Sequence, residues 1–177
     1  MHFVGRADWS FADYPYPTSA DTHGLARSIL VGGPQGAIHT ELVLSQLASG
    51  GWLNHHIHSY EESLFVLSGE LLADIDGQAR KLQPGDFGLH PLGVTHAVAN
   101  IGTQPARWLS VNTPQRLPLD DDRKDTFFSR QPFDLAALVA RAAMPTYGNP
   151  ELRNIGHEQH DGATTDGKVQ AMAMFNF

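Results

Sequence analysis

The sequence contains no cysteine among its 177 residues. Disulfide bonds, thiolate metal ligands and a cysteine nucleophile are therefore excluded, and the composition fits a reducing cytosol. Positive charge is also scarce, with 12 lysines and arginines against 19 aspartates and glutamates and a formal net charge of −7. This balance argues against nucleic acid as a partner.

Long apolar runs are missing as well. No uninterrupted apolar segment approaches the roughly 18 residues of a membrane-spanning helix. The first ten residues, MHFVGRADWS, lack the charged segment and the apolar segment that build a signal peptide. We therefore expect a cytoplasmic protein without a membrane partner, whose length allows one hydrophobic core.

Histidine is abundant by contrast, with ten residues in the chain. His56 and His58 are one residue apart, so on a strand both side chains face the same side. Glu62 lies four positions further and faces the same side if the strand continues. His96 supplies a third imidazole if its strand pairs nearby. Imidazoles and a carboxylate suit Mn, Fe, Ni, Cu or Zn better than Mg or Ca.

The spacing around these residues is regular in two segments. The first reads G-x5-H-x-H-x3-E-x6-G from Gly50 to Gly69, and the second reads G-x5-P-x-G-x2-H-x3-N from Gly85 to Asn100. Both match the halves of the cupin signature at every fixed position, so the chain resembles the cupin superfamily of metal-binding barrels over residues 38–113. This resemblance implies four metal ligands: His56, His58, Glu62 and His96.

Short strands separated by turns predict an all-β sandwich or barrel. Ile38 to Leu47 alternates as a half-buried strand that ends at Gly50 and Gly51, and Trp52 to His58 forms the next strand. Asp76-Gly77 between two strand-like runs is a strong hairpin signal. The resemblance to cupins narrows the fold to a jelly-roll β-barrel.

The barrel is expected at residues 38–115, between an N-terminal arm with an edge strand at 1–37 and a linker, helix and tail at 116–177. Aromatic residues and prolines before residue 24 predict an extended arm that lies on the barrel or on a partner. This arm and the tail favour a homodimer.

A helix is predicted after Asp134, which is a good N-cap, with Phe133 and Leu138 as a hydrophobic staple. Leu135, Leu138, Val139 and Ala142 share its apolar face, and Pro145 ends it. The run Asp120–Asp122 is interpreted as a solvated loop rather than a Ca²⁺ site. The tail at 147–177 either adds strands to the barrel or to a partner subunit, or is the remnant of a second cupin repeat.

The predicted pocket is mostly apolar. Asn54 and Tyr60 share the side of His56 and His58, while Leu64, Val66, Val94 and Val98 line the remaining wall. His90, before the proline turn, is a further pocket candidate. No arginine or lysine lies within the ligand strands, which disfavours oxalate as a substrate.

Open positions on an octahedral metal favour a catalytic site over a structural one. The leading hypothesis is an Fe(II) dioxygenase-like oxidoreductase acting on a small apolar or aromatic molecule. Glu62 is then a ligand or base, and Tyr60 is a hydrogen-bond donor or acid. Mn, Zn or Ni are alternatives to the favoured iron. A redox-neutral lyase, isomerase or aminohydrolase, or a binding barrel without turnover, stays open.

Overall fold

The structure is a computed structural model that describes residues 2–7, 21–117 and 123–143. Most of the predicted aromatic arm, the Asp120–Asp122 loop, Pro145 and the tail at 147–177 lie outside these ranges. Among the residues that the structure describes, no helix has the length and apolar character to cross a membrane.

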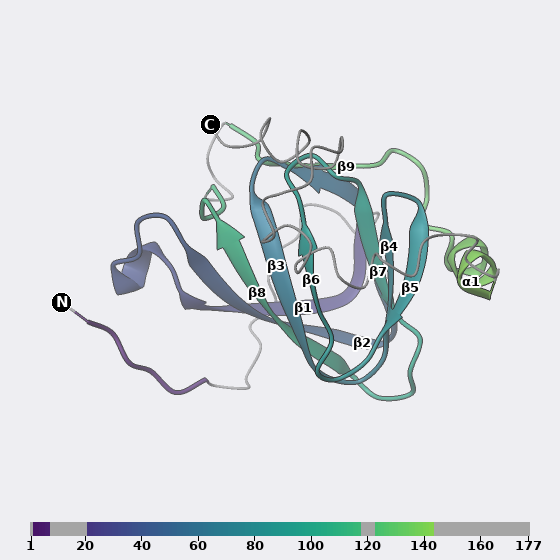
Figure 1. The fold of residues 1–177 in the computed structure, drawn as a ribbon, viewed down its shortest axis with the longest axis horizontal. Helices are drawn as coiled ribbons and strands as arrows, with labels where there is room; N and C mark the ends of the chain where they lie inside the picture. The colour runs from purple at the N-terminus through teal and green to yellow at the C-terminus, as the bar shows by residue number, and fades with distance from the viewer. Residues whose placement is uncertain (1, 8–20, 118–122, 144–177) are drawn as a thin grey trace, which may run out of the picture. The chain divides into compact units, whose positions relative to one another are not determined.

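Antiparallel strands form a nearly closed barrel, and the predicted all-β jelly-roll fold is confirmed (Figure 1). The order across the sheet is β5-β4-β7-β2-β8-β3-β6, while β1 and β9 each pair with β2. The elements are β1 (Thr22–Val31), η1 (Gly33–Gln35), β2 (Glu41–His58), β3 (Glu61–Ser68), β4 (Leu71–Ile75), β5 (Gln78–Leu82), β6 (Phe87–His90), β7 (His96–Asn100), β8 (Ala106–Thr113), β9 (Thr126–Phe128) and α1 (Leu135–Ala143).

Strand β2 connects the two halves of the barrel. Its first part pairs with β8 and its later part pairs with β7. The prediction that this strand ends at Gly50 and Gly51 is wrong, because β2 runs through both glycines. Gly50 has a φ of 71°, and a Cβ on Gly51 would lie 2.8 Å from the carbonyl oxygens of Ala48 and His23. Glycine therefore allows β2 to bend while β1 pairs with it on both sides.

The hairpin between β4 and β5 follows the local sequence. Asp76 and Gly77 have φ angles of 52° and 76°, which a type I′ turn requires. The predicted hairpin is confirmed, and its strands pair in register from Leu71 opposite Leu82 to Ile75 opposite Gln78.

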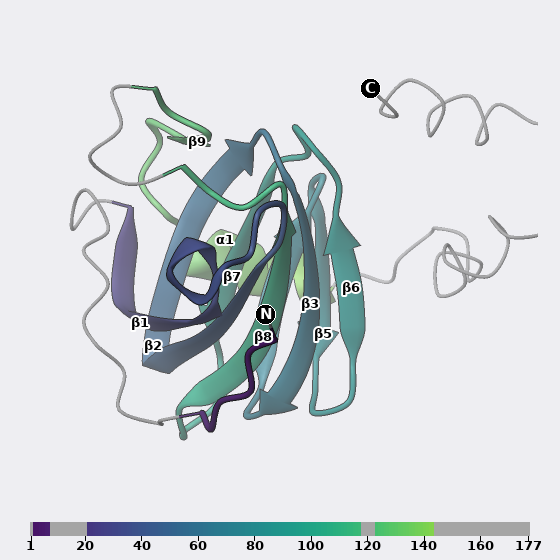
Figure 2. The same cartoon turned by 90° about the vertical axis from the view of Figure 1, so that its left-hand side faces the viewer.

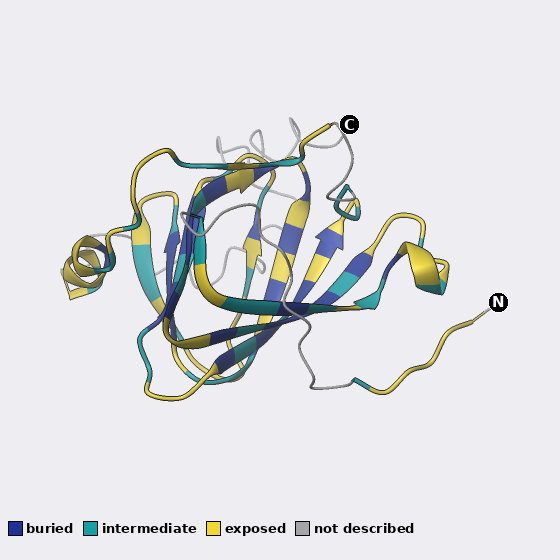
Figure 3. Cartoon of the chain, turned by 180° about the vertical axis from the view of Figure 1, so that it is seen from behind, coloured by how far each residue is buried: buried dark blue, intermediate teal, exposed yellow. Residues whose placement is uncertain are grey.

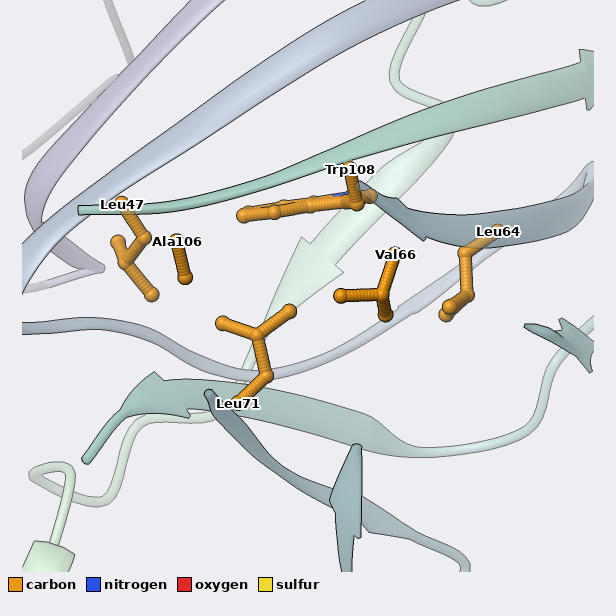
Figure 4. Packing of buried hydrophobic residues seen from close by; sticks show 6 residues of the cluster. All are labelled: Leu47, Leu64, Val66, Leu71, Ala106 and Trp108. Carbon is orange, nitrogen blue, oxygen red and sulfur yellow. The ribbon is translucent and has the colours of Figure 1, made fainter. Parts of the chain in front are cut away.

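Buried and exposed residues alternate along β3 and β8 (Figure 3). Figure 2 shows β3 beside β6 and β1 beside β2. The inward residues of several strands meet in one apolar cluster (Figure 4), which consists of Leu47, Leu64, Val66, Leu71, Ala106 and Trp108. Burying each of the larger side chains contributes about 1.5 to 3 kcal/mol, so this cluster is a main source of barrel stability.

Helix α1 lies on the outside of the barrel, against β4 and β5 (Figure 1). The predicted N-cap is confirmed, since the Ala137 backbone N–H donates to Asp134 Oδ1 at 2.9 Å. Leu138 is fully buried, and the Phe133 ring stacks on that of Trp52 with centroids 5.0 Å apart. Val139 is 46% exposed, so the buried face is narrower than predicted.

Replacing Asp74 with asparagine is expected to lower the free energy of unfolding by about 2 kcal/mol. Asp74 is 1% exposed, and its Oδ2 accepts hydrogen bonds from Arg141 of α1 and His55 of β2. The neutral amide loses both charge-assisted contacts and loosens the helix. Urea denaturation measures the change, with Asp76→Asn in the exposed turn as the matched control. Equal stability of the two variants would contradict this role for Asp74.

Candidate metal centre

Four buried side chains converge inside the barrel: His58, Glu62, His90 and His96. One ligand atom from each lies within 4.8 Å of the others. Strand pairing produces this arrangement, because Glu62 on β3 lies opposite His90 on β6, and His56 on β2 lies opposite His96 on β7. Residues far apart in the sequence therefore face one point.

Glu62 Oε2 is at the centre of the group. It lies 3.5 Å from His58 Nε2, 3.6 Å from His90 Nδ1 and 3.8 Å from His96 Nε2. The same His58 and His96 atoms, and both ring nitrogens of His90, are buried and have no hydrogen-bond partner among the residues that the structure describes. Buried polar atoms left in this state are costly, and a shared cation would satisfy one nitrogen of each imidazole. The donor set therefore fits a divalent transition metal.

Backbone carbonyls orient the imidazoles. A carbonyl oxygen only accepts a hydrogen bond, so each bonded Nδ1 carries the proton and each Nε2 keeps its lone pair for a metal. The three Nδ1–oxygen distances are 2.8 Å for His56 with Asn54, 2.6 Å for His58 with Tyr60, and 2.9 Å for His96 with Val94. The local chain thus presets the tautomer that ligation needs.

Ser110 orients the carboxylate in a similar way. Its hydroxyl donates to Glu62 Oε1 at 2.6 Å, which leaves Oε2 directed at the imidazoles. Burial by itself would raise the pKa of Glu62, but its interactions with His58 and His90 outweigh burial and hold that pKa well below the usual range. Glu62 is therefore a carboxylate anion, the form that binds a cation.

Burial keeps two of the imidazoles uncharged. It lowers the pKa of His56 to about 3, although the hydrogen bond to Asn54 and the charge of Glu62 act in the opposite direction. Burial also lowers the pKa of His96 far below its ordinary value, and the neighbouring His56 and His90 lower it further. Neutral imidazole is the form that binds a metal.

A small cavity adjoins the centre. Its polar lining residues are Arg27, His56, Glu62, His90 and His96. Its apolar lining residues are Leu53, Leu64, Leu71, Ala73, Leu82, Val98 and Trp108. An apolar enclosure with a few convergent polar groups is typical of small-molecule sites. The predicted lining by Leu64 and Val98 is confirmed, whereas Val66 is part of the apolar cluster.

The structure brings three of the predicted ligands, His58, Glu62 and His96, together with His90. His56 lies beside them, with its ring centroid 4.1 Å from that of His96, and lines the same cavity. Its role as a ligand stays a prediction. His90 was only a pocket candidate, because its position opposite Glu62 depends on the pairing of β3 with β6.

Two predicted pocket residues lie elsewhere. The register shift in β2 between Leu53 and His56 places Leu53 on the cavity side, while the Asn54 side chain bonds the His55 N–H and the Gln131 carbonyl. The Tyr60 ring stacks on His58 with centroids 4.0 Å apart, and its hydroxyl lies 3.3 Å from Thr126 Oγ1. Tyr60 therefore supports His58, and its role as an acid stays a prediction.

Two contributors were missed in the sequence. Strand β9 covers the end of β2, where the Phe128 ring stacks on His56 with centroids 5.1 Å apart. Arg27 on β1 is 5% exposed and reaches the cavity. Neither segment has a motif, and only the pairing of both strands with β2 places them at the centre.

The barrel and its buried histidine–carboxylate centre define a small β-barrel protein with a possible metal site. Residues 43–112 match the family model described as the cupin domain. Residues 43–112 therefore form a cupin domain, as the two motifs predicted.

Three relatives illustrate the similarity. Over 85 residues the chain is 29% identical to "Polyketide synthase CurC" of Streptomyces cyaneus, a match that covers 48% of this chain and 55% of CurC, so the aligned region spans about half of that relative. The structure of the polyketide cyclase RemF from Streptomyces resistomycificus aligns with a TM-score of 0.57 and 21% identity, covering 66% of this chain and 83% of RemF. A cupin-2 domain of Rhodospirillum rubrum aligns with a TM-score of 0.54 and 19% identity, covering 67% of this chain and 82% of its own.

Proposed function

We propose that this protein is a metal-dependent enzyme that promotes a redox-neutral ring closure in a polyketide-type or aromatic small molecule. The observation that carries the proposal is the group of partnerless buried imidazole nitrogens around Glu62, at the wall of an apolar cavity. The substrate class is suggested by CurC, whose name associates it with polyketide synthesis. The structural similarity to RemF supports the fold alone.

The residues have separate tasks in this reaction. His58, Glu62, His90 and His96, with His56 beside them, would hold the metal, which when bound supplies a Lewis acid for carbonyl oxygens. The apolar wall from Leu53 to Trp108 binds the carbon skeleton and excludes water. Glu62, kept ionised, accepts a proton from an acidic carbon that lies between two carbonyl groups. The carbon left with the electron pair then bonds to a second carbonyl carbon of the same molecule, and the oxygen of that carbonyl takes the proton back from Glu62. The hydroxyl group formed leaves with a neighbouring C–H proton as water, so the ring closes without a change of oxidation state.

A dioxygenase reaction on an aromatic molecule is the second candidate. The observation that favours it is the combination of His58, His96 and Glu62, because two histidines and one carboxylate with open positions are typical of non-haem Fe(II) oxygenases. The same cavity wall would bind the aromatic ring.

Turnover with and without oxygen separates these candidates. The protein is purified without a nickel column, loaded separately with Zn²⁺, Mn²⁺ and Fe²⁺, and incubated with an aryl 1,3,5-triketone under nitrogen and under air. We expect a cyclised product smaller by one water under nitrogen, and none with the His58→Ala variant. Oxygen uptake that requires Fe²⁺ would establish the dioxygenase instead. If no product forms under either gas, both enzyme candidates fail, and a barrel that binds a small molecule without turnover is the better interpretation.

A homodimer is proposed through the outer face of β3, β6 and β8. Four exposed apolar residues gather there: Phe65, Phe87, Leu89 and Val111. Phe87 lies opposite Phe65, and both Leu89 and Val111 lie opposite Ser63, so the residues are neighbours on adjacent strands. Strand β6 is also at the end of the main strand order. A contiguous apolar face of this kind is typical of an interface.

The Phe87→Glu variant is expected to be a monomer, because it places a charge within this apolar face. Phe87 is 80% exposed, so the change leaves the core intact. Size-exclusion chromatography with light scattering measures the mass. Ile38→Glu, at a residue 76% exposed outside the face, is the matched control and should stay dimeric. A monomeric wild-type protein would refute the proposal.

A further inference from the structure

The two carboxylate oxygens of Glu62 have different partners. Oε2 lies 3.5 to 3.8 Å from ring nitrogens of His58, His90 and His96. Oε1 instead accepts a hydrogen bond of 2.6 Å from the Ser110 hydroxyl on β8. Both residues are buried, and this distance is typical of a hydroxyl that donates to an ionised carboxylate. One oxygen is therefore directed to the candidate metal centre, and the other is held by the protein.

The pairing of β3 with β8 explains why a serine reaches this oxygen. Glu62 lies directly opposite Asn112, and Leu64 lies opposite Ser110. Ser110 and Asn112 are two positions apart on β8, so both face the interior, where both are buried. The Asn112 amide donates to Glu41 Oε2 at 2.9 Å. Ser110, the diagonal neighbour of Glu62, is within reach of Oε1. A strand outside both motifs thus supplies the donor.

This hydrogen bond affects how Glu62 can bind a cation. A carboxylate binds a metal through one oxygen or through both. Without the hydroxyl, Oε1 would be buried without this donor, which is unfavourable, and binding to the metal would relieve that cost. The second oxygen would then take a coordination position that the proposed reaction needs for a substrate carbonyl. A carboxylate oxygen has two acceptor sites, so Oε1 can hold the hydrogen bond and still take the proton that is transferred.

We propose that Ser110 is a positioning residue that restricts Glu62 to one oxygen at the metal and thereby keeps a coordination position available for a carbonyl oxygen of the substrate. This inference rests on the proposed function, because it concerns how the same centre receives its substrate. A serine suits this task, since its short side chain donates one hydrogen bond and carries no charge. Ser110 acts through Glu62 and does not contact the substrate.

Binding of acetohydroxamate to Co²⁺-loaded protein tests the assignment, because this small chelator presents a carbonyl oxygen to a metal. The visible spectrum of bound Co²⁺ is recorded for wild type and Ser110→Ala, before and during a titration with the chelator. We expect the spectrum of Ser110→Ala to differ from that of wild type before any chelator is added, because Oε1 joins the metal. The affinity of this variant for acetohydroxamate should be roughly 10-fold lower, since the chelator must displace that oxygen.

The Ser45→Ala variant is the matched control. Ser45 is a fully buried serine opposite Trp108, so its side chain is on the inner face of the sheet, but its hydroxyl has no hydrogen-bond partner within the described part of the chain. This variant should equal wild type in spectrum and in chelator affinity.

A second pair of variants isolates the hydroxyl group. Ser110→Thr and Ser110→Val have nearly the same shape and differ in the hydroxyl alone. The threonine variant should behave as wild type, and the valine variant should behave as Ser110→Ala. This pair carries the test if the alanine variant does not fold.

The inference is overturned if either the spectrum or the chelator affinity of Ser110→Ala equals that of wild type. An unchanged spectrum would mean that Oε1 does not join the metal, and an unchanged affinity would mean that no coordination position is lost. Failure of the proposed function is a different result. Absent ring closure by metal-loaded protein would reject the reaction alone, because the Ser110 test requires no turnover. Absent Co²⁺ uptake by wild type would reject both proposals.

Discussion

The His58→Ala variant is expected to contain less than about one tenth of the metal found in wild type, because loss of a ligand costs more than the 10- to 100-fold in affinity that loss of a ligand-orienting contact costs. Within the described part of the chain, His58 Nε2 is buried without a hydrogen-bond partner and lies 3.5 Å from Glu62 Oε2, so its loss removes a donor at the centre of the site. Elemental analysis of protein purified without a nickel column measures the content. Wild type should hold close to one equivalent.

His39→Ala is the matched control, because His39 is an exposed histidine outside the candidate centre. Its metal content should equal that of wild type. Equal metal in the His58 and His39 variants, or no metal in wild type after reconstitution, would contradict a metal centre at His58.

The affinity for Zn²⁺ assigns the remaining imidazoles. His90 has two partnerless ring nitrogens near Glu62, whereas the motif implies His56. We expect His56→Ala and His90→Ala each to lower the affinity for Zn²⁺, measured by competition with a chromophoric chelator. A loss in one variant alone would assign the third imidazole ligand to that residue.

The Gly69→Ala variant is expected to lose about 3 to 5 kcal/mol of unfolding free energy. Gly69 has a φ of 81°, and a Cβ would lie 2.5 Å from Ala106 Cα and 2.7 Å from Ala106 Cβ. Ala106 belongs to the apolar cluster and is fully buried, so neither chain can move away freely. Urea denaturation measures the loss. A thermal melt should rank wild type, Gly77→Ala and Gly69→Ala in the same order of stability.

The Gly77→Ala variant separates the cost of the positive φ angle from the cost of the steric clash with Ala106. Gly77 has a similar φ of 76°, but a Cβ there meets nothing within 4 Å. Its variant should lose only the backbone contribution, about 1 to 2 kcal/mol. If both variants were equally destabilised, the close approach of Gly69 to Ala106 would carry no cost.

Short-range patterns were sufficient for several features of this protein. Asp76-Gly77 encodes its turn in two adjacent residues, because a type I′ turn depends on their own φ angles. Asp134 caps α1 through a backbone N–H three residues away. The two cupin motifs placed His58, Glu62 and His96 in the candidate centre for the same reason, since each motif contains the turn that positions its ligands.

The pairing between strands decided which of the other side chains face the cavity. Alternation assigns a side within one uninterrupted strand, but the register shift in β2 moved Asn54 away from the cavity and Leu53 into it. The side of His90 depends on the pairing of β6 with β3, and that of Arg27 on the pairing of β1 with β2. The candidate metal ligands in the two motifs were readable because their spacing is local. The position of Arg27 was not, because this residue reaches the cavity only through the pairing of β1 with β2.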